Sequence, residues 1–125
     1  MSVAVFELSH LFQVNPKAIA AEGMTGITVL SDEGDPLACG GVIYAPWGVE
    51  LWIQVRDDLS VIEAIKVART AKHYVRIASM NEPVFAHVFA KDEERRARLL
   101  GWLGLEKETE IESEQGPCSR YRMVT

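Results

Sequence analysis

The feature that most constrains the fold is one amphipathic helix that interrupts a chain otherwise rich in β-forming segments. Apolar residues recur between Ser60 and Ser79 at spacings of three and four, the period of a helix with one buried side. Ser60 and Glu63 have the spacing of a capping box, in which each side chain accepts a hydrogen bond from the other residue's backbone amide. We therefore expect a helix from Ser60 to about Ser79. Its expected buried side consists of Val61, Ala64, Ile65, Ala68, Ala71, Val75 and Ala78.

Three strands are predicted before this helix, between residues 26 and 56. Turn-forming residues at 33–36 and 46–48 separate short β-rich runs, as in an antiparallel meander. The third run alternates with a period of two, so one of its faces is expected to point into the core. The aliphatic face of that run consists of Val49, Leu51, Ile53 and Val55.

The N-terminal segment, residues 3–22, is predicted to form two short helices. Pro16 suits a helix start and disfavours helix in the residue before it, so the break is expected at Asn15-Pro16. The residues expected on the buried side of this segment are Phe6, Leu8, Leu11 and Phe12.

After the long helix the sequence predicts a strand, a helix and a hairpin. Residues 83–90 are expected to form the strand, Asp92 to N-cap the helix and Gly104 to C-cap it. Residues 105–113 and 118–125 alternate around a turn and are expected to form the hairpin. The complete order predicts an α/β (α+β) protein with a mixed, mostly antiparallel sheet flanked by helices.

Composition limits the classes of function. The chain has 125 residues, 48% of them hydrophobic, which suits one soluble domain spanning residues 1–125. A formal net charge of -5 argues against nucleic acid as a partner. The apolar stretches are too short for a membrane span, and the three histidines are too scattered to suggest a metal site. Cys39 and Cys118 form no CxxC motif, so we expect free thiols and a cytoplasmic location.

Two segments carry a resemblance to a known family. The strand–turn–strand from Asp32 to Val42 is similar to the second and third strands of the GNAT N-acetyltransferase superfamily. Phe85–Ala90, followed by Ala97–Leu105, resembles the strand and helix that end in that family's Leu-Gly-Phe turn, with Leu105 in place of Phe. The overall pattern is also similar to the small GNAT-like internal virion proteins of tailed phages.

The resemblance implies a site on the third strand and at the start of the long helix. The backbone of Ile53, Gln54 and Val55 would contact acetyl-CoA, and Ser60 would lie where the family binds pyrophosphate. Glu50 matches the family's general base. The sequence departs from the family in two places. Residues 56–63 contain no glycine, and Leu100 stands at the position of the usual general-acid Tyr.

Two functions follow as expectations. The first is transfer of acetyl from acetyl-CoA to an amine substrate, with Glu50 as the base. The alternative is a catalytically inactive GNAT-fold protein, such as a phage virion or assembly component, that acts through a protein partner or as a homodimer. Trp47 and Trp52 are candidates either for packing or for a ligand cleft or protein interface. His87 is expected to be a hydrogen-bonded structural histidine, and the location would be the cytoplasm or the virion.

Overall fold

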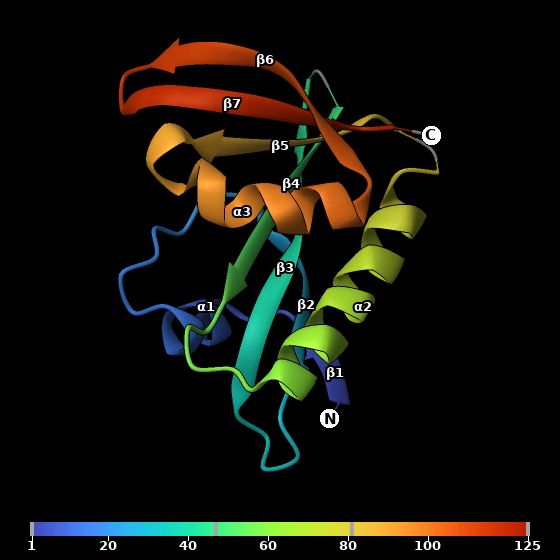
Figure 1. The fold of residues 1–125 in the computed structure, drawn as a ribbon. Helices are drawn as coiled ribbons and strands as arrows, with labels where there is room; N and C mark the ends of the chain where they lie inside the picture. Colours follow the sequence, from blue (N-terminus) through green and yellow to red (C-terminus); the bar gives the residue numbers. More distant parts are fainter. Residues whose placement is uncertain (1, 47, 81, 125) are drawn as a thin grey trace.

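A computed structural model describes residues 2–46, 48–80 and 82–124, and within them the chain forms one seven-stranded sheet with three helices. The strand order is β1-β2-β3-β4-β5-β7-β6 (Figure 1). The elements are β1 (Ser2–Val5), α1 (Leu8–Val14), β2 (Thr25–Leu30), β3 (Pro36–Ala45), β4 (Gly48–Val55), α2 (Val61–Ala78), β5 (Val84–Phe89), α3 (Ala90–Leu103), β6 (Leu105–Ser113) and β7 (Gly116–Met123).

The sheet is mixed and mostly antiparallel, as predicted. Neighbouring strands pair antiparallel except β4 and β5, which pair parallel. The connection between these two strands is α2, the crossover that a parallel pair requires. The expected α+β class is therefore confirmed.

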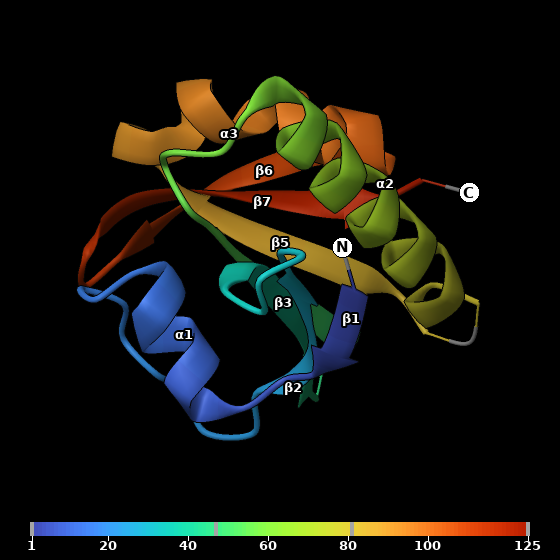
Figure 2. The ribbon, with the colours of Figure 1, turned by 90° about the horizontal axis from the view of Figure 1, so that it is seen from below.

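Helices cover both faces of the sheet, as Figure 2 shows: α2 and α3 lie on one face and α1 on the other. The main core lies between the sheet and the α2–α3 pair. A smaller cluster around Leu11 lies between α1 and the strands β3 and β4. The buried residues of the main core are Val42, Val49, Leu51, Val75, Val84, Ala86, Val88, Leu100, Leu103, Leu105 and Tyr121.

Two paired glycines, Gly26 on β2 and Gly41 on β3, allow these strands to lie close together. A Cβ atom on Gly41 would overlap the carbonyl oxygen of Thr25 on β2, and one on Gly26 would overlap the carbonyl oxygen of Gly40. Only glycine allows β2 and β3 to approach this closely at this point.

The prediction for the N-terminal segment was wrong in part. Residues 2–5 form an edge strand that pairs with β2, and only Leu8–Val14 is helical. Leu11 is buried as expected, whereas Leu8 and Phe12 are exposed. The alternating Val3 and Val5 suit a strand, but the partner that makes them one comes more than 20 residues later in the chain.

The long helix has the predicted limits and the predicted cap. The Glu63 amide donates to Ser60 Oγ at 3.2 Å, and the Ser60 amide donates to Glu63 Oε1 at 3.0 Å. Its buried side was predicted partly wrongly: Val61 and Ile65 are exposed, whereas Val67 is buried. Apolar residues lie around much of the circumference of this helix. The contacts with β3 and α3, rather than the spacing of apolar residues in its sequence, therefore decide which of them are buried.

The second long helix starts earlier than predicted. Phe89 is its N-cap, so Asp92 lies in the first turn instead of capping it. The reason is that β5 runs directly into α3 without a loop. Gly104 is the C-cap, as expected, with a positive φ of 98° that favours glycine. None of the helices described is long and apolar enough to cross a membrane.

Candidate functional site

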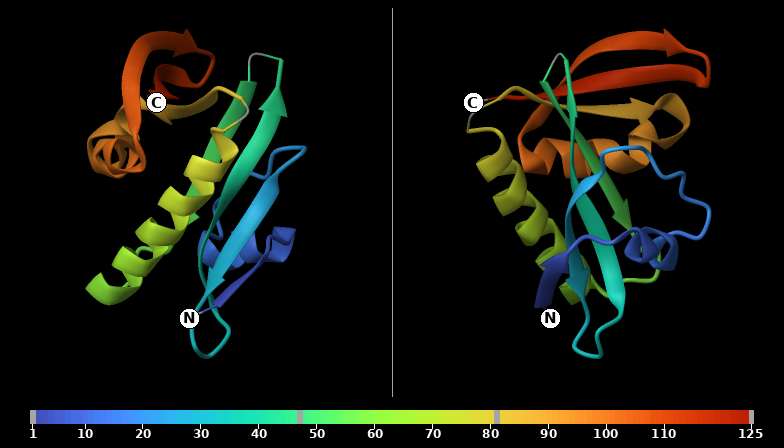
Figure 3. Two further views of the ribbon diagram at one scale, coloured as in Figure 1. Left: turned by 90° about the vertical axis from the view of Figure 1, so that its right-hand side faces the viewer. Right: turned by 180° about the vertical axis from the view of Figure 1, so that it is seen from behind.

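The two parallel strands in the middle of the sheet diverge. Among the described residues, β4 and β5 pair only through Val49 with Val84 and Glu50 with Phe85. Beyond Glu50, β4 continues to Val55 with no strand beside it on that side in the described chain, while the other edge of β5 pairs with β7 from Phe85 to Phe89. Figure 3 shows β3 and β4 running steeply across the directions of β5, β6 and β7. The divergence leaves one edge of β4 open.

Backbone directions along β4 decide which groups face this open edge. The Val49 amide donates across to Pro83 O at 2.9 Å, and the Arg56 amide donates to Leu37 O, towards β3, at 3.0 Å. Hydrogen-bonding groups alternate along a strand, so the N–H and C=O of Ile53 and Val55 point to the open edge. Arg96 on α3 donates to Ile53 O at 3.5 Å, which agrees with this direction.

Gln54 has a different environment from its two neighbours. Its backbone groups point to β3, where Cys39 is its register partner. Its side chain accepts a hydrogen bond from Asn15 Nδ2 at 3.1 Å, which ties the end of α1 to β4. Of the three predicted cofactor-binding residues on β4, Ile53 and Val55 therefore present backbone groups to the open edge, and Gln54 faces α1.

The start of α2 lies beyond the end of β4. Ser60 uses both its amide and its hydroxyl in the capping box with Glu63. In the preceding loop, Arg56 binds Asp58 through two hydrogen bonds of 2.9 and 2.7 Å. Hydrogen bonding by this guanidinium lowers the pKa of the Asp58 carboxyl. The negative charge of Asp58 is thus matched locally, whereas Asp57 is exposed to solvent.

Glu50 and His87 form a hydrogen-bonded pair where the strands separate. His87 Nδ1 lies 2.6 Å from Glu50 Oε1. Because a carboxylate only accepts, the imidazole N–H donates in this bond. Glu50 Oε2 is buried and has no hydrogen-bond partner. The pair lies on the face of the sheet that α1 partly covers, since Glu50 alternates with the core-facing Val49 and Leu51.

Sequence reasoning selected Glu50 but not its partner. His87 was expected to be a hydrogen-bonded structural histidine, and it is hydrogen-bonded, but to the predicted base. The two residues are 37 positions apart. The available signal was a polar residue on the mixed face of each of two strands, and it becomes useful only once those strands are known to be neighbours.

Other residues weighed for chemistry have packing roles. Leu100, at the position of the family's acid, is a buried core residue. Trp52 packs edge-on against Phe6, and its indole N–H donates to Thr25 O at 3.2 Å; Trp47 lies outside the described residues. Burial raises the pKa of the Cys39 thiol to about 11, and burial also raises the pKa of Cys118. Both cysteines are free and buried thiols.

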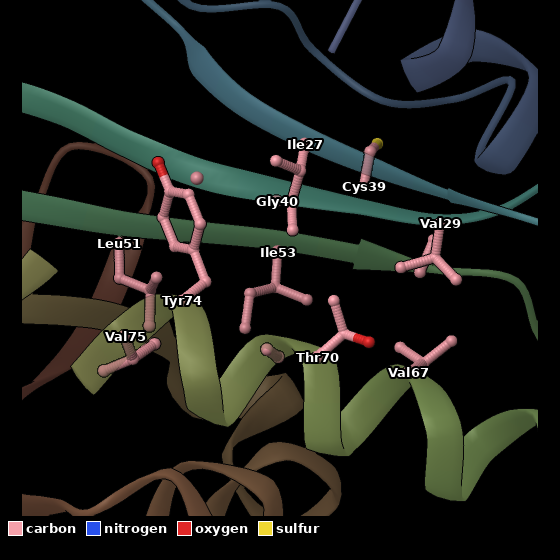
Figure 4. A pocket seen from close by; sticks show the side chains of 13 residues that line it. Ile27, Val29, Cys39, Gly40, Leu51, Ile53, Val67, Thr70, Tyr74 and Val75 are labelled. Atoms are coloured by element: carbon pink, nitrogen blue, oxygen red, sulfur yellow. The ribbon is translucent and has the colours of Figure 1, made fainter. Parts of the chain in front are cut away.

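A small apolar cavity lies between α2 and the strands β2–β4, on the opposite side of the sheet from Glu50. Its volume is about 30 Å³, room for a water molecule or two. Figure 4 shows Ile53 and Val67 pointing into it. Its lining surface is almost entirely apolar, so the cavity offers neither the space nor the polar groups that a substrate requires.

The overall arrangement is that of known acetyltransferases. No protein-family model matches the sequence, and no curated protein matches it. A solved structure of a mutant spermidine N-acetyltransferase SpeG from Vibrio cholerae superimposes with a TM-score of 0.71, over 99% of this chain and 95% of that one, at 10% identity. The chain has the GNAT acetyltransferase fold. The aminoglycoside acetyltransferase AAC(6')-Ib, solved with coenzyme A and kanamycin, gives a TM-score of 0.65 over 82% of this chain and 67% of that one, at 11% identity.

The GNAT resemblance is therefore confirmed for the fold. Sequence identities of 10 and 11% support a shared architecture and nothing finer. The roles predicted for Glu50, Ile53, Gln54, Val55 and Ser60 stay predictions, which the geometry above makes testable.

Proposed function

We propose that this chain is an acyl-CoA-dependent N-acetyltransferase that acetylates an amine. The observation that carries the proposal is the position of the Glu50–His87 pair, at the point where β4 and β5 separate. The GNAT fold supports it, because two solved structures of similar architecture are acetyltransferases.

Acetyl-CoA would supply an acyl group on an activated thioester carbon. Glu50 takes the proton that leaves the acceptor ammonium, and the freed electron pair on nitrogen forms the new C–N bond as the C–S bond breaks. His87 donates to Glu50 Oε1 and holds in place a carboxylate whose side chain is 20% exposed, where the acceptor can approach it. The nitrogen gives its second proton to solvent as the amide forms, and the leaving thiolate takes up a proton from solvent, because Leu100 has a hydrocarbon side chain with no proton to donate.

The chain fits one part of acetyl-CoA better than the other. The Ile53 amide and the Val55 amide and carbonyl, on the open edge of β4, can pair with the amide-bearing thioester arm, whereas the Ile53 carbonyl already accepts from Arg96. The start of α2 fits a pyrophosphate less well, because residues 56–63 contain no glycine and the capping box uses the Ser60 and Glu63 amides. We therefore expect weaker binding than a glycine-rich phosphate loop gives.

A second candidate function is that of a catalytically inactive GNAT-fold protein, such as a virion or assembly component, that binds a protein partner. The observation in its favour is the first part of α2, where Val61, Ile62 and Ile65 are exposed. Apolar residues gathered on the surface commonly serve protein contacts. The buried Leu100 in place of a proton donor also suits an inactive protein.

The first test is calorimetric titration of the purified chain with acetyl-CoA and with CoA. Ile53→Pro removes an amide that points to the open edge, whereas Ile53→Ala keeps the amide and loses a similar amount of packing. We expect binding that Ile53→Pro weakens at least about tenfold more than Ile53→Ala does, a difference of about 1.4 kcal/mol.

A Glu50→Gln variant separates catalysis from binding. It should bind acetyl-CoA as the unmodified chain does, yet lose acetyl transfer by about a hundredfold or more, the scale of general-base catalysis. No binding heat with millimolar acetyl-CoA would overturn the acetyltransferase proposal and favour the protein-contact function.

A further inference from the structure

We propose that the amine acetylated by this chain also carries a carboxylate, which Arg120 and Arg122 bind on the same face of the sheet as Glu50 and His87. The inference rests on the proposed function and specifies its substrate class: an aminocarboxylate rather than a polyamine or another polycation.

The arginines stand on the strand next to the Glu50–His87 pair. β5 and β7 are antiparallel neighbours, and their register pairs His87 with Arg120 and Phe85 with Arg122. Directly paired residues project to the same face of a sheet. Glu50 is itself the register partner of Phe85 on the other side. A carboxylate and two guanidinium groups thus flank β5 from opposite sides.

The guanidinium groups of Arg120 and Arg122 lie over the ring of Phe85. Its side chain is buried, and the Arg120 guanidinium carbon lies 4.0 Å from the centre of its ring, while that of Arg122 lies 5.8 Å away. Stacking on an aromatic ring holds a guanidinium plane while its N–H groups remain directed outwards in the plane. Such a platform suits recognition of a carboxylate.

The acidic groups around the two arginines do not satisfy them. Glu108 on β6 is shared between them, 3.3 Å from Arg120 Nε and 3.7 Å from Arg122 Nη1. The contact with Arg120 is an ion pair without hydrogen-bond geometry, so it satisfies Nε only in part. Glu106, the register partner of Arg122, is exposed to solvent. Two positive charges therefore share one close carboxylate.

Side chains of opposite charge are partly exposed on this face. Glu50 Oε2 accepts no hydrogen bond, and Arg120 Nε makes only the ion-pair contact with Glu108. The side chains of Glu50, Arg120 and Arg122 are 20, 27 and 53% exposed, so a ligand can reach each of them. The ammonium of an aminocarboxylate would meet Glu50, and its carboxylate would meet the arginines. A polyamine would satisfy Glu50 but would place further positive charge beside Arg120 and Arg122.

The test compares primary amines with and without a carboxylate, and γ-aminobutyrate and butylamine are the pair with the same number of carbon atoms. Glycine, β-alanine and γ-aminobutyrate vary the distance between the two groups, butylamine lacks the carboxylate, and spermidine represents a polycation. Each is measured by calorimetric binding to the chain and by acetyl transfer from acetyl-CoA. We expect at least one aminocarboxylate to bind about tenfold or more tightly than butylamine, with spermidine the weakest.

Variants assign the effect to the arginines. Arg122→Gln alters a half-exposed side chain and should raise the KM for the aminocarboxylate about tenfold while leaving that for butylamine unchanged. Arg120→Lys retains the charge at the more buried position without the planar group and should weaken binding as well. Arg95→Gln, an exposed arginine on α3, is the matched control and should change neither value.

The outcomes separate this inference from the function on which it rests. Acetyl transfer to butylamine or spermidine at least as good as to the aminocarboxylates would overturn the inference and leave the acetyltransferase standing. Aminocarboxylate binding that depends on Arg122, without any binding of acetyl-CoA, would overturn the acetyltransferase and support the subsite. Aminocarboxylate binding that Arg122→Gln and Arg120→Lys leave unchanged would also overturn the inference.

Discussion

Glu93 joins α3 to the C-terminal hairpin through a compact polar cluster. Replacing Glu93 measures how much this cluster contributes to the stability of the fold. Ser119 Oγ donates to Glu93 Oε1 at 2.5 Å, and Tyr121 OH donates to Glu93 Oε2 at 2.9 Å. Lys107 Nζ lies 3.1 Å from the same carboxylate. Ser119 and Tyr121 are both buried, so their hydroxyl groups have little access to water.

In Glu93→Gln, one of the two hydroxyls must face an amide NH₂, which donates instead of accepting. A buried hydroxyl left without an acceptor costs about 1–3 kcal/mol, and a hydrogen bond to a charged group contributes about 1.5–3 kcal/mol. Because these two figures describe overlapping effects, we expect the free energy of unfolding at pH 7 to fall by about 2–3 kcal/mol. The measurement is urea unfolding followed by circular dichroism.

The loss should depend on pH in a definite direction. Hydrogen bonds from Ser119 and Tyr121 lower the pKa of Glu93 below its ordinary value of 4.5. A carboxyl with a lowered pKa stabilises the folded chain above its ordinary pKa, and the stabilisation disappears as the pH falls through the folded value. The difference between the unmodified chain and Glu93→Gln should therefore be full near pH 7 and shrink below about pH 4.5. A difference that is constant from pH 7 to pH 3, or under about 0.5 kcal/mol throughout, would refute the reasoning.

Two further predictions concern one glycine and the two cysteines. Gly101 lies inside α3, and a Cβ at its position would meet open space. Gly101→Ala should therefore raise the free energy of unfolding by about 0.5–1 kcal/mol in the same urea experiment. A fall in the free energy of unfolding would contradict this prediction. Cys39 and Cys118 are buried with raised pKa values, so neither thiol should react with a disulfide reagent at pH 8 until the chain is unfolded in urea, and rapid labelling of the folded chain would be inconsistent with this packing.

The sequence predicted correctly those features that depend on interactions between neighbouring residues. The capping box from Ser60 to Glu63 and the C-cap at Gly104 each depend on a few consecutive residues, and both are present as predicted. The start of α3 was misplaced because Asp92 is a good N-cap residue in isolation, whereas the strand before it determines where the helix begins.

Features that depend on distant contacts could not be predicted in the same way. Residues 2–5 become a strand because β2 is available beside them, and Val67 is buried because α2 rests on β3. The link between Glu50 and His87 exists only because β4 and β5 are parallel neighbours. The sequence contains each of these residues, but the partner of each is set by the fold.

The narrow joint between β4 and β5 makes the two parts of the sheet depend on side-chain packing more than on backbone pairing. In the described residues, β1–β4 and β5–β7–β6 are joined by two register pairs, Val49 with Val84 and Glu50 with Phe85. The main core crosses this joint, because Val42 and Leu51 share one buried cluster with Val84 and Ala86. Contacts between α2, which packs on β3, and α3, which packs on β5 and β7, link the same two parts, and Lys72 Nζ lies 4.4 Å from the centre of the Trp102 ring. The position of one part of the sheet on the other therefore depends on residues of the core and the helices, several of them remote from Glu50.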